Sequence, residues 1–95
     1  MKAIKIERNP GEKRLQELSV KSWPIWEKEV SEFTWFYDNQ ETCYFLAGEV
    51  EVIPDKGTAV KIRKNDLVIF PKGLSCFWKI KQAARKHYLF EDQNF

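Results

Sequence analysis

The sequence predicts an all-β fold, an antiparallel barrel within a single domain. From about residue 23 onward, short segments of alternating polarity are separated by turn-forming residues every eight to twelve positions or so, a pattern typical of sandwiches and barrels. A chain of 95 residues can bury one core and not two. Four Trp, three Tyr and seven Phe help so short a chain to fill that core. We therefore expect one domain over 1–95.

The N-terminal part, at about 2–20, predicts a strand followed by a short helix. Residues 2–7 alternate in polarity, as a strand does. Asn9 is a candidate helix cap, and Pro10 suits the first helical position. We expect this helix to end near Val20.

The barrel itself is expected over about 23–92. Its expected strands are 30–37, 43–53, 59–63, 67–70, 75–80 and 85–90. Gly48 interrupts the longest of these and predicts a bend or bulge. Asn65 stands in a turn, where asparagine tolerates a positive φ better than other non-glycine residues.

Two stretches of the barrel have the spacing of known motifs. Trp35 to Gly48 resembles the first cupin motif, Gly-x5-His-x-His-x3-Glu-x6-Gly, and Asn65 to Cys76 resembles the second, Gly-x5-Pro-x-Gly-x2-His-x3-Asn. The resemblance implies an RmlC-like cupin barrel, that is, a double-stranded β-helix or jelly roll with a ligand pocket in its mouth. Residues 41–48, 70–73 and 85–88 further resemble the ureidoglycine aminohydrolase-like subgroup, in particular its small stand-alone cupins.

The metal-binding residues of the motif are largely replaced. Glu41 stands at the carboxylate position, whereas Trp35, Tyr37 and Cys76 stand where the motif has histidines. The chain contains one histidine, His87, while metal sites of this type need several imidazoles. We therefore expect a metal-independent protein with no cofactor, and neither the manganese site nor the reaction of the subgroup's namesake enzyme. The alternative metal is a Zn ion held by Glu41 and Cys76.

Four residues are candidate catalytic groups: Glu41, Tyr37, Lys86 and Cys76. Glu41 in an aromatic barrel is either a general acid or base, or an inherited acid neutralised by a neighbouring Lys or Tyr. By strand alternation Lys86 faces the opposite side from His87. The resemblance favours Lys86 as the inward residue and partner of Glu41, the alternative being an exposed strand lysine. Tyr37 is placed to hydrogen-bond a ligand or Glu41.

The two cysteines each have two interpretations. Cys76, brought into the pocket next to Lys86, is either a nucleophilic or redox-sensitive thiol or a small apolar filler. Cys43 shares the face of Glu41 and is a candidate ligand contact, although filler is the stronger interpretation.

Aromatic residues make up the rest of the expected pocket. Trp35, Trp78 and Tyr88 are candidate ligand-binding residues. For Trp35 and Trp78, as for Tyr37, the alternative is that the rings simply fill space. Trp26 and Phe33, with Trp23, are instead expected to cover the outside of the barrel or a subunit contact.

Composition excludes several classes of partner. A net charge of +2 with interspersed acids and bases favours neither nucleic acid nor a membrane surface. No apolar run is long enough to cross a bilayer, and the charged N-terminus is unlike a signal peptide. Two cysteines do not make a disulfide framework, so we expect a cytoplasmic, reducing location. The resemblance to cupins, which often pair through strands or sheets, implies a homodimer, and the aromatic N-terminal third offers a surface for it.

Two functions remain open on the sequence. The first is a metal-independent enzyme, an isomerase or epimerase or a hydrolase, acting on a small polar metabolite through Glu41, Tyr37 and Lys86. The alternative is a non-catalytic cupin module that binds or senses a small molecule.

Overall fold

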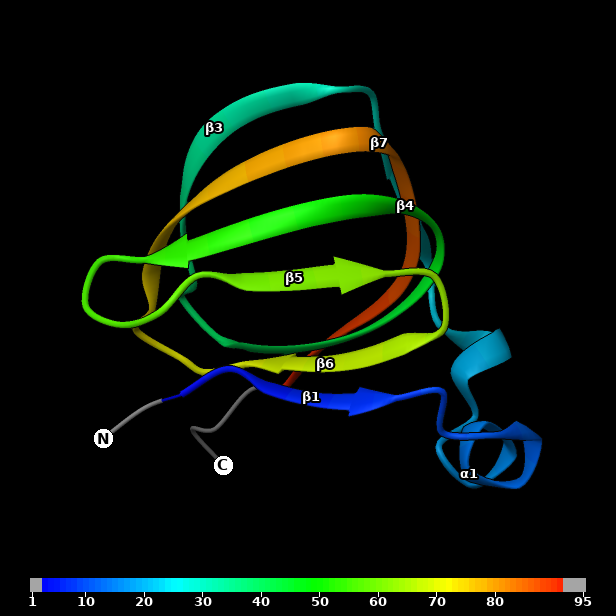
Figure 1. Cartoon of the computed structure of the whole chain (residues 1–95). Coiled ribbons are helices and arrows are strands. Elements are labelled where there is room, and N and C mark those ends of the chain that lie inside the picture. The colour runs from blue at the N-terminus through cyan, green and yellow to red at the C-terminus, as the bar shows by residue number, and fades with distance from the viewer. Residues whose placement is uncertain (1–2, 92–95) are drawn as a thin grey trace.

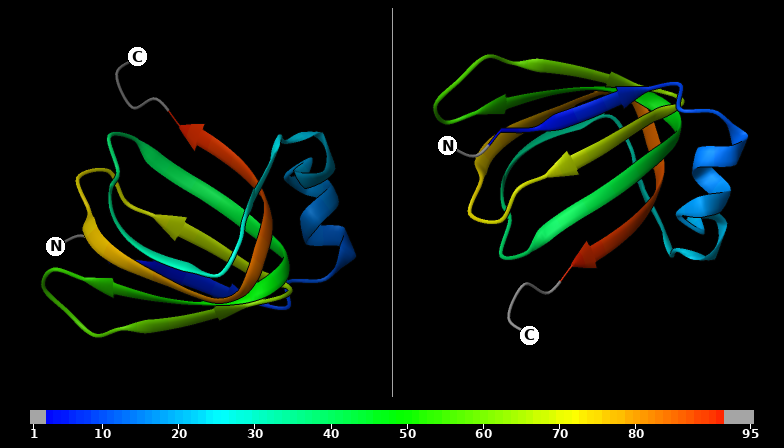
Figure 2. Two further views of the ribbon diagram at one scale, coloured as in Figure 1. Left: turned by 90° about the horizontal axis from the view of Figure 1, so that it is seen from above. Right: turned by 90° about the horizontal axis from the view of Figure 1, so that it is seen from below.

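Seven strands of one antiparallel sheet curl around a common core in the computed structural model, which describes residues 3–91 (Figures 1 and 2). The strands are β1 Lys5–Arg8, β2 Ile25–Lys28, β3 Ser31–Phe36, β4 Gln40–Pro54, β5 Val60–Arg63, β6 Asp66–Phe70 and β7 Ser75–Glu91. Helix α1 (Glu12–Glu17) and the 3-10 turn η1 (Val20–Ser22) lie outside the barrel between β1 and β2. The predicted all-β cupin-like fold is thus confirmed, with a minor helical part.

The two longest strands, β4 and β7, organise the sheet. They pair with each other along most of their length, while β4 also pairs with β5 and β6, and β7 with β2 and β3. Each can serve three neighbours because both strands bend and their two halves face different parts of the barrel (Figure 1). The sheet therefore wraps the core with two strands as its main support.

Gly48 makes the bend possible. Its φ is 106°, and a Cβ placed on it would lie 2.7 Å from both the carbonyl oxygen of Ala83 and the Cα of Ala84. The pairing of β4 with β7 shifts register between Phe45 and Val50, around this glycine. The predicted bend in the long strand is therefore confirmed, and the close approach of β7 requires a residue without a side chain.

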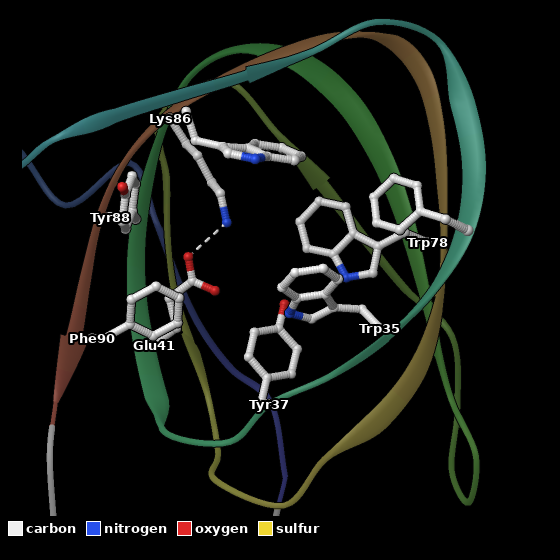
Figure 3. Close-up of a pocket in the computed structure, with 9 residues that line it drawn as sticks. Trp35, Tyr37, Glu41, Trp78, Lys86, Tyr88 and Phe90 are labelled. Carbon is white, nitrogen blue, oxygen red and sulfur yellow. Dashed lines mark hydrogen bonds and ion pairs between the residues drawn. The ribbon is translucent and has the colours of Figure 1, made fainter.

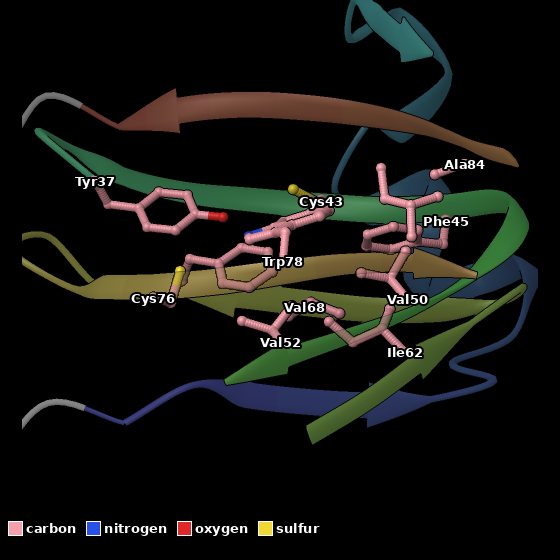
Figure 4. Close-up of a cluster of buried hydrophobic side chains, with 12 residues drawn as sticks. Tyr37, Cys43, Phe45, Val50, Val52, Ile62, Val68, Cys76, Trp78 and Ala84 are labelled. Atoms are coloured by element: carbon pink, nitrogen blue, oxygen red, sulfur yellow. The ribbon is translucent and has the colours of Figure 1, made fainter. Parts of the chain in front are cut away.

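The core fills the inside of the barrel beneath its open end. Twelve buried side chains form one cluster that runs from Ala84 and Phe45 at one end to Tyr37 and Cys76 at the other (Figure 4). The rings of Tyr37 and Phe70 stack with centroids 4.8 Å apart and an interplanar angle of 6°. Aromatic stacking of this kind adds to the area buried by each ring, as expected for a short chain with many aromatic residues.

The N-terminal helix differs from the prediction. Asn9 does not cap it; Gly11 occupies the N-cap position, and no side chain bonds to the free amides. Asn9 instead has a φ of 48°, and its backbone N–H donates to the carbonyl of Asn65 at 3.0 Å. Asn9 thus joins the end of β1 to the turn before β6. The helix, Glu12–Glu17, begins later and ends earlier than expected.

The C-terminal strands also differ from the prediction. Segments 75–80 and 85–90 were expected as separate strands, but they form one bent strand, β7. Residues 81–84, expected as a connection, continue the strand, and residues 82–84 pass close to Gly48. The turn at Asn65 is as expected, with φ 75°. Residues 2 and 92, the outer limits of the predicted strand and barrel, lie outside the described residues.

Candidate functional site

A cavity of about 250 Å³ lies at the open end of the barrel (Figure 3). Its lining residues are Trp26, Phe33, Trp35, Tyr37, Glu41, Trp78, Lys86, Tyr88 and Phe90. Seven of these nine are aromatic, and the two charged residues, Glu41 and Lys86, point toward each other and are in direct contact. Trp35 and Phe90 are 49% and 48% exposed, so they form the rim where the cavity meets solvent.

Strand alternation explains how these side chains meet. Lys86, Tyr88 and Phe90 are alternate residues of β7 and therefore point to the same face. Phe33 and Trp35 do the same on β3, whose next alternate residue, Tyr37, follows the end of the strand. The backbone of Tyr37 is fixed on both sides, since its N–H donates to Leu74 and its carbonyl accepts from Gly73.

A buried ion pair is the polar centre of the site. Lys86 Nζ donates to Glu41 Oε2 at 2.9 Å, and each of the two side chains is 5% exposed. The same ammonium group donates to Cys43 Sγ at 3.1 Å. It also lies 4.9 Å from the ring centroid of Trp26 and 5.1 Å from that of Trp78. The sequence-based pairing of Lys86 with Glu41 is therefore observed.

Lys86 keeps its proton despite its burial. Burial works against the charged form, but the neighbouring Cys43 sulfur and the Glu41 carboxylate more than offset it, and the pKa of Lys86 is raised. The polar centre of the cavity is consequently an ammonium group paired with the Glu41 carboxylate.

Two buried polar atoms of the site have no hydrogen-bond partner. They are Tyr37 Oη and the indole Nε1 of Trp78, within the part of the chain that the structure describes. Tyr37 is 1% exposed and Trp78 2%. Burial raises the pKa of Tyr37 far above its ordinary value, and the Glu41 carboxylate raises it further. Tyr37 is thus a neutral donor close to a second donor.

The structure does not bring Cys76 into the cavity. The residue is 4% exposed and belongs to the core cluster, and its Sγ lies 3.7 Å from the carbonyl oxygen of Trp35. Burial raises the pKa of its thiol to about 11, the direction opposite to that of an activated thiolate. The filler interpretation describes Cys76 better.

Cys43 touches the site without lining it. It is fully buried, and its Sγ accepts a hydrogen bond from Lys86. Burial raises the pKa of this thiol strongly, although Lys86 acts in the opposite direction. Cys43 therefore positions the ammonium group rather than offering a surface to a ligand.

The sequence-based prediction was wrong for two aromatic residues of the cavity and overlooked a third. Trp35, Trp78 and Tyr88 line it as expected, but Trp26 and Phe33, predicted to lie on the outside, line it too. The ring of Phe33 stacks on Trp78 with centroids 5.8 Å apart, and Trp26 meets Trp78 edge to face at 5.9 Å. The remaining lining residue, Phe90, was not singled out. Alternation from Lys86 and Tyr88 would have found it.

His87 faces away from the cavity, as alternation predicts. Its Nδ1 lies 2.9 Å from the carbonyl oxygen of Trp23 and forms a buried hydrogen bond there. This contact ties β7 to the segment that precedes β2. The only histidine of the chain is therefore a structural residue of the opposite face.

The residues present do not fit the metal that the cupin motif implies. No group of three or more His, Cys, Asp or Glu side chains within residues 3–91 could hold a metal ion. Glu41 is bound by Lys86, the indole at position 35 offers no metal-binding lone pair, and Cys76 lies outside the cavity. The alternative Zn site does not fit either, because Cys76 lies outside the cavity that Glu41 lines.

Such a barrel, closed around an aromatic core with a pocket at its mouth, is the architecture of a cupin. The family model described as the EutQ-like cupin domain matches residues 15–88, and the chain belongs to that family. None of the helices in residues 3–91 is long and apolar enough to cross a bilayer. The finer resemblance to ureidoglycine aminohydrolase-like cupins stays a sequence-based prediction.

Solved structures agree with this assignment. A crystal structure of a DUF861-family protein from Thermotoga maritima is 56% identical over 94% of this chain and 100% of that chain, with a TM-score of 0.90. EutQ from Clostridium difficile is 24% identical over 75% of this chain, with a TM-score of 0.65, and the match spans 56% of EutQ. The putative ethanolamine utilization protein Q of Salmonella typhimurium is 23% identical over 74% of this chain and 56% of its own, also with a TM-score of 0.65. The last two show the fold alone. No curated protein matches the chain significantly.

Proposed function

We propose that this protein binds a small, flat organic molecule in the mouth of its barrel, without a metal. The observation that carries this proposal is the aromatic cavity itself, which surrounds a buried ion pair and two donors without partners. A chain that only needed a filled core would gain stability from replacing these polar groups by apolar ones. An open cavity that contains such polar groups has what a binding site requires.

The size of the cavity limits the ligand. Pockets for drug-sized molecules measure roughly 300 to 1,000 Å³. A cavity of about 250 Å³ is slightly smaller, which suits a single ring with a few substituents. Aromatic walls favour a planar molecule, since stacked and edge-to-face contacts both need flat partners.

A catalytic role is the second candidate. It is favoured by one observation: Glu41 Oε1 makes no hydrogen bond within residues 3–91, while Oε2 is bound to Lys86. A carboxylate oxygen free to contact a ligand, beside a cation and a neutral phenol, could move a proton in an isomerase, epimerase or hydrolase reaction. Lys86 would then stabilise negative charge that develops on the substrate.

A thermal-shift screen of planar metabolites and fragments tests binding. We expect some compounds to raise the melting temperature of the wild type, and Trp35→Ala to weaken their binding by about tenfold because a wall of the site is removed. Phe36→Ala is the matched control. Phe36 is the adjacent strand residue, 53% exposed, and it does not line the cavity, so its replacement should leave affinity unchanged.

Mass spectrometry of each bound compound separates the two candidates. Consumption by the wild type but not by Glu41→Gln would support an enzyme, and binding without consumption by either would support a binding module. A screen in which no compound stabilises the wild type, or in which both alanine variants lose binding equally, would contradict the proposal.

A further inference from the structure

We infer that the ligand of this cavity is an uncharged, planar molecule that carries a hydrogen-bond donor next to an acceptor, as an aromatic amide or lactam does. The inference rests on the proposed binding function and names the chemical class for that same site. Three features of the site carry it: the balance of its charges, the direction of its unpartnered polar atoms and the form of its walls.

The first feature is that neither charge of the site is free. Lys86 already occupies the position over the Trp26 and Trp78 rings that an aromatic site would offer to a cationic ligand. Lys86 Nζ and Glu41 Oε2 are 2.9 Å apart. A cationic ligand would therefore lie beside the ammonium group, and an anionic ligand would lie beside the carboxylate. A ligand with a net charge would lose its hydration without gaining an unshared counter-ion, whereas an uncharged ligand loses less.

The second feature is a set of polar atoms that need partners of opposite kinds. Tyr37 Oη and Trp78 Nε1 are buried donors without acceptors in the described residues, and both side chains line the cavity. Glu41 Oε1 is an acceptor without a donor there. Figure 3 shows the Glu41 carboxylate and the Tyr37 hydroxyl pointing toward the same part of the cavity. One ligand oxygen would satisfy the donors, and an adjacent N–H would satisfy Glu41.

The third feature is the flat apolar enclosure around these atoms. Phe33 and Trp78 are stacked with an interplanar angle of 17°, and Trp26 stands at 75° to Trp78, so flat faces and ring edges both border the cavity. A ring joined to an amide or lactam is planar throughout, and it would place its apolar face against these side chains. An aliphatic polyol would instead bury several hydroxyl groups, and beyond the three polar atoms above the aromatic walls offer them no partner.

A matched series of probes on one ring tests the inference. Benzamide, benzoate, benzamidine and toluene share a benzene ring and differ in one substituent, which is neutral and polar, anionic, cationic or apolar. Titrated at neutral pH and followed by the indole N–H signals in proton–nitrogen NMR spectra, benzamide should bind at least about tenfold more tightly than the other three. The Trp78 indole signal should move on binding, because its N–H gains an acceptor.

Tyr37→Phe supplies the matched variant. The hydroxyl it removes has no protein partner, so the variant should fold and be at least as stable as the wild type. It should nevertheless bind benzamide about tenfold more weakly, and its affinity for toluene should be unchanged. A merely structural Tyr37 would not separate the two probes.

Tightest binding of benzoate, benzamidine or toluene would overturn the chemical class and leave the proposed binding function standing. Failure of all four probes would also overturn it, and the metabolite screen would then decide the binding function separately. An equal loss of benzamide and toluene in Tyr37→Phe would remove the assigned role of the phenol.

Discussion

Lys86→Met is expected to lower the free energy of unfolding by about 3 to 5 kcal/mol at neutral pH. Methionine retains the apolar stem and so preserves most packing, but it removes the ammonium group that accompanies Glu41. Glu41 is 4% exposed, and Lys86 provides its hydrogen bond among the described residues. An unpaired carboxylate would then remain in an aromatic cavity, and total stabilities of small domains are only about 5 to 15 kcal/mol. Urea unfolding followed by tryptophan fluorescence measures the loss.

Two further variants make this result specific. Glu41→Gln combined with Lys86→Met removes both charges, and we expect it to recover most of the lost stability because the pair itself contributes little net free energy. Lys61→Met, at an exposed strand position, should change stability by about 0.5 kcal/mol or less. A double variant as unstable as Lys86→Met would show that the loss comes from packing and would refute the buried-pair explanation.

Alkaline pH is expected to produce the second large effect. Burial raises the pKa of Cys76 to about 11 and raises that of Cys43 further, while an unfolded cysteine has a pKa of about 8.5. The folded state therefore holds protons that the unfolded state releases. Stability is complete below about pH 8.5 and falls as pH rises toward 11, by about 1.4 kcal/mol per pH unit for each cysteine. Tyr37, whose pKa is also raised by burial, adds to the loss above about pH 10.

Urea unfolding at several pH values between about 8 and 10.5 measures this slope. Cys76→Ala should reduce the steepness by about 1.4 kcal/mol per pH unit while lowering stability at pH 8 through the lost packing. A free energy of unfolding that stays level across this range would mean that the cysteines are not buried thiols in the folded protein.

Local pattern was enough to predict the strands of the barrel and to place Lys86 on the opposite face of its strand from His87. The resemblance to cupins, and not the pattern, favoured Lys86 as the inward residue. Alternation along β7 holds from Lys86 to Phe90 because the register shifts of its pairing with β4 all lie between Phe45 and Val50, and none separates Lys86 from Tyr88 or Phe90. The bend at Gly48 and the positive φ of Asn65 were likewise predictable, since both follow from the conformational freedom of the residue itself.

The inner positions of Trp26 and Phe33 could not be predicted in this way. They depend on which edges of β7 receive β2 and β3, with Trp26 opposite Lys86 and Phe33 opposite Trp78. Such pairings join residues far apart in the chain, and a hydrophobic period shows two faces without saying which one turns inward. Cys76 was placed in the pocket by motif spacing alone, but its side chain packs within the core.

Mapping the bound state by proton–nitrogen NMR tests the central claim of a ligand site at the barrel mouth most directly. With a compound that raises the melting temperature, we predict that the largest shifts fall on the Trp78 indole N–H and on the backbone amides of residues lining the cavity, Tyr37, Glu41 and Lys86 among them. Amides of α1, outside the barrel, should stay unchanged. Shifts confined to α1 or spread over the outer surface, with the cavity residues unmoved, would contradict the account.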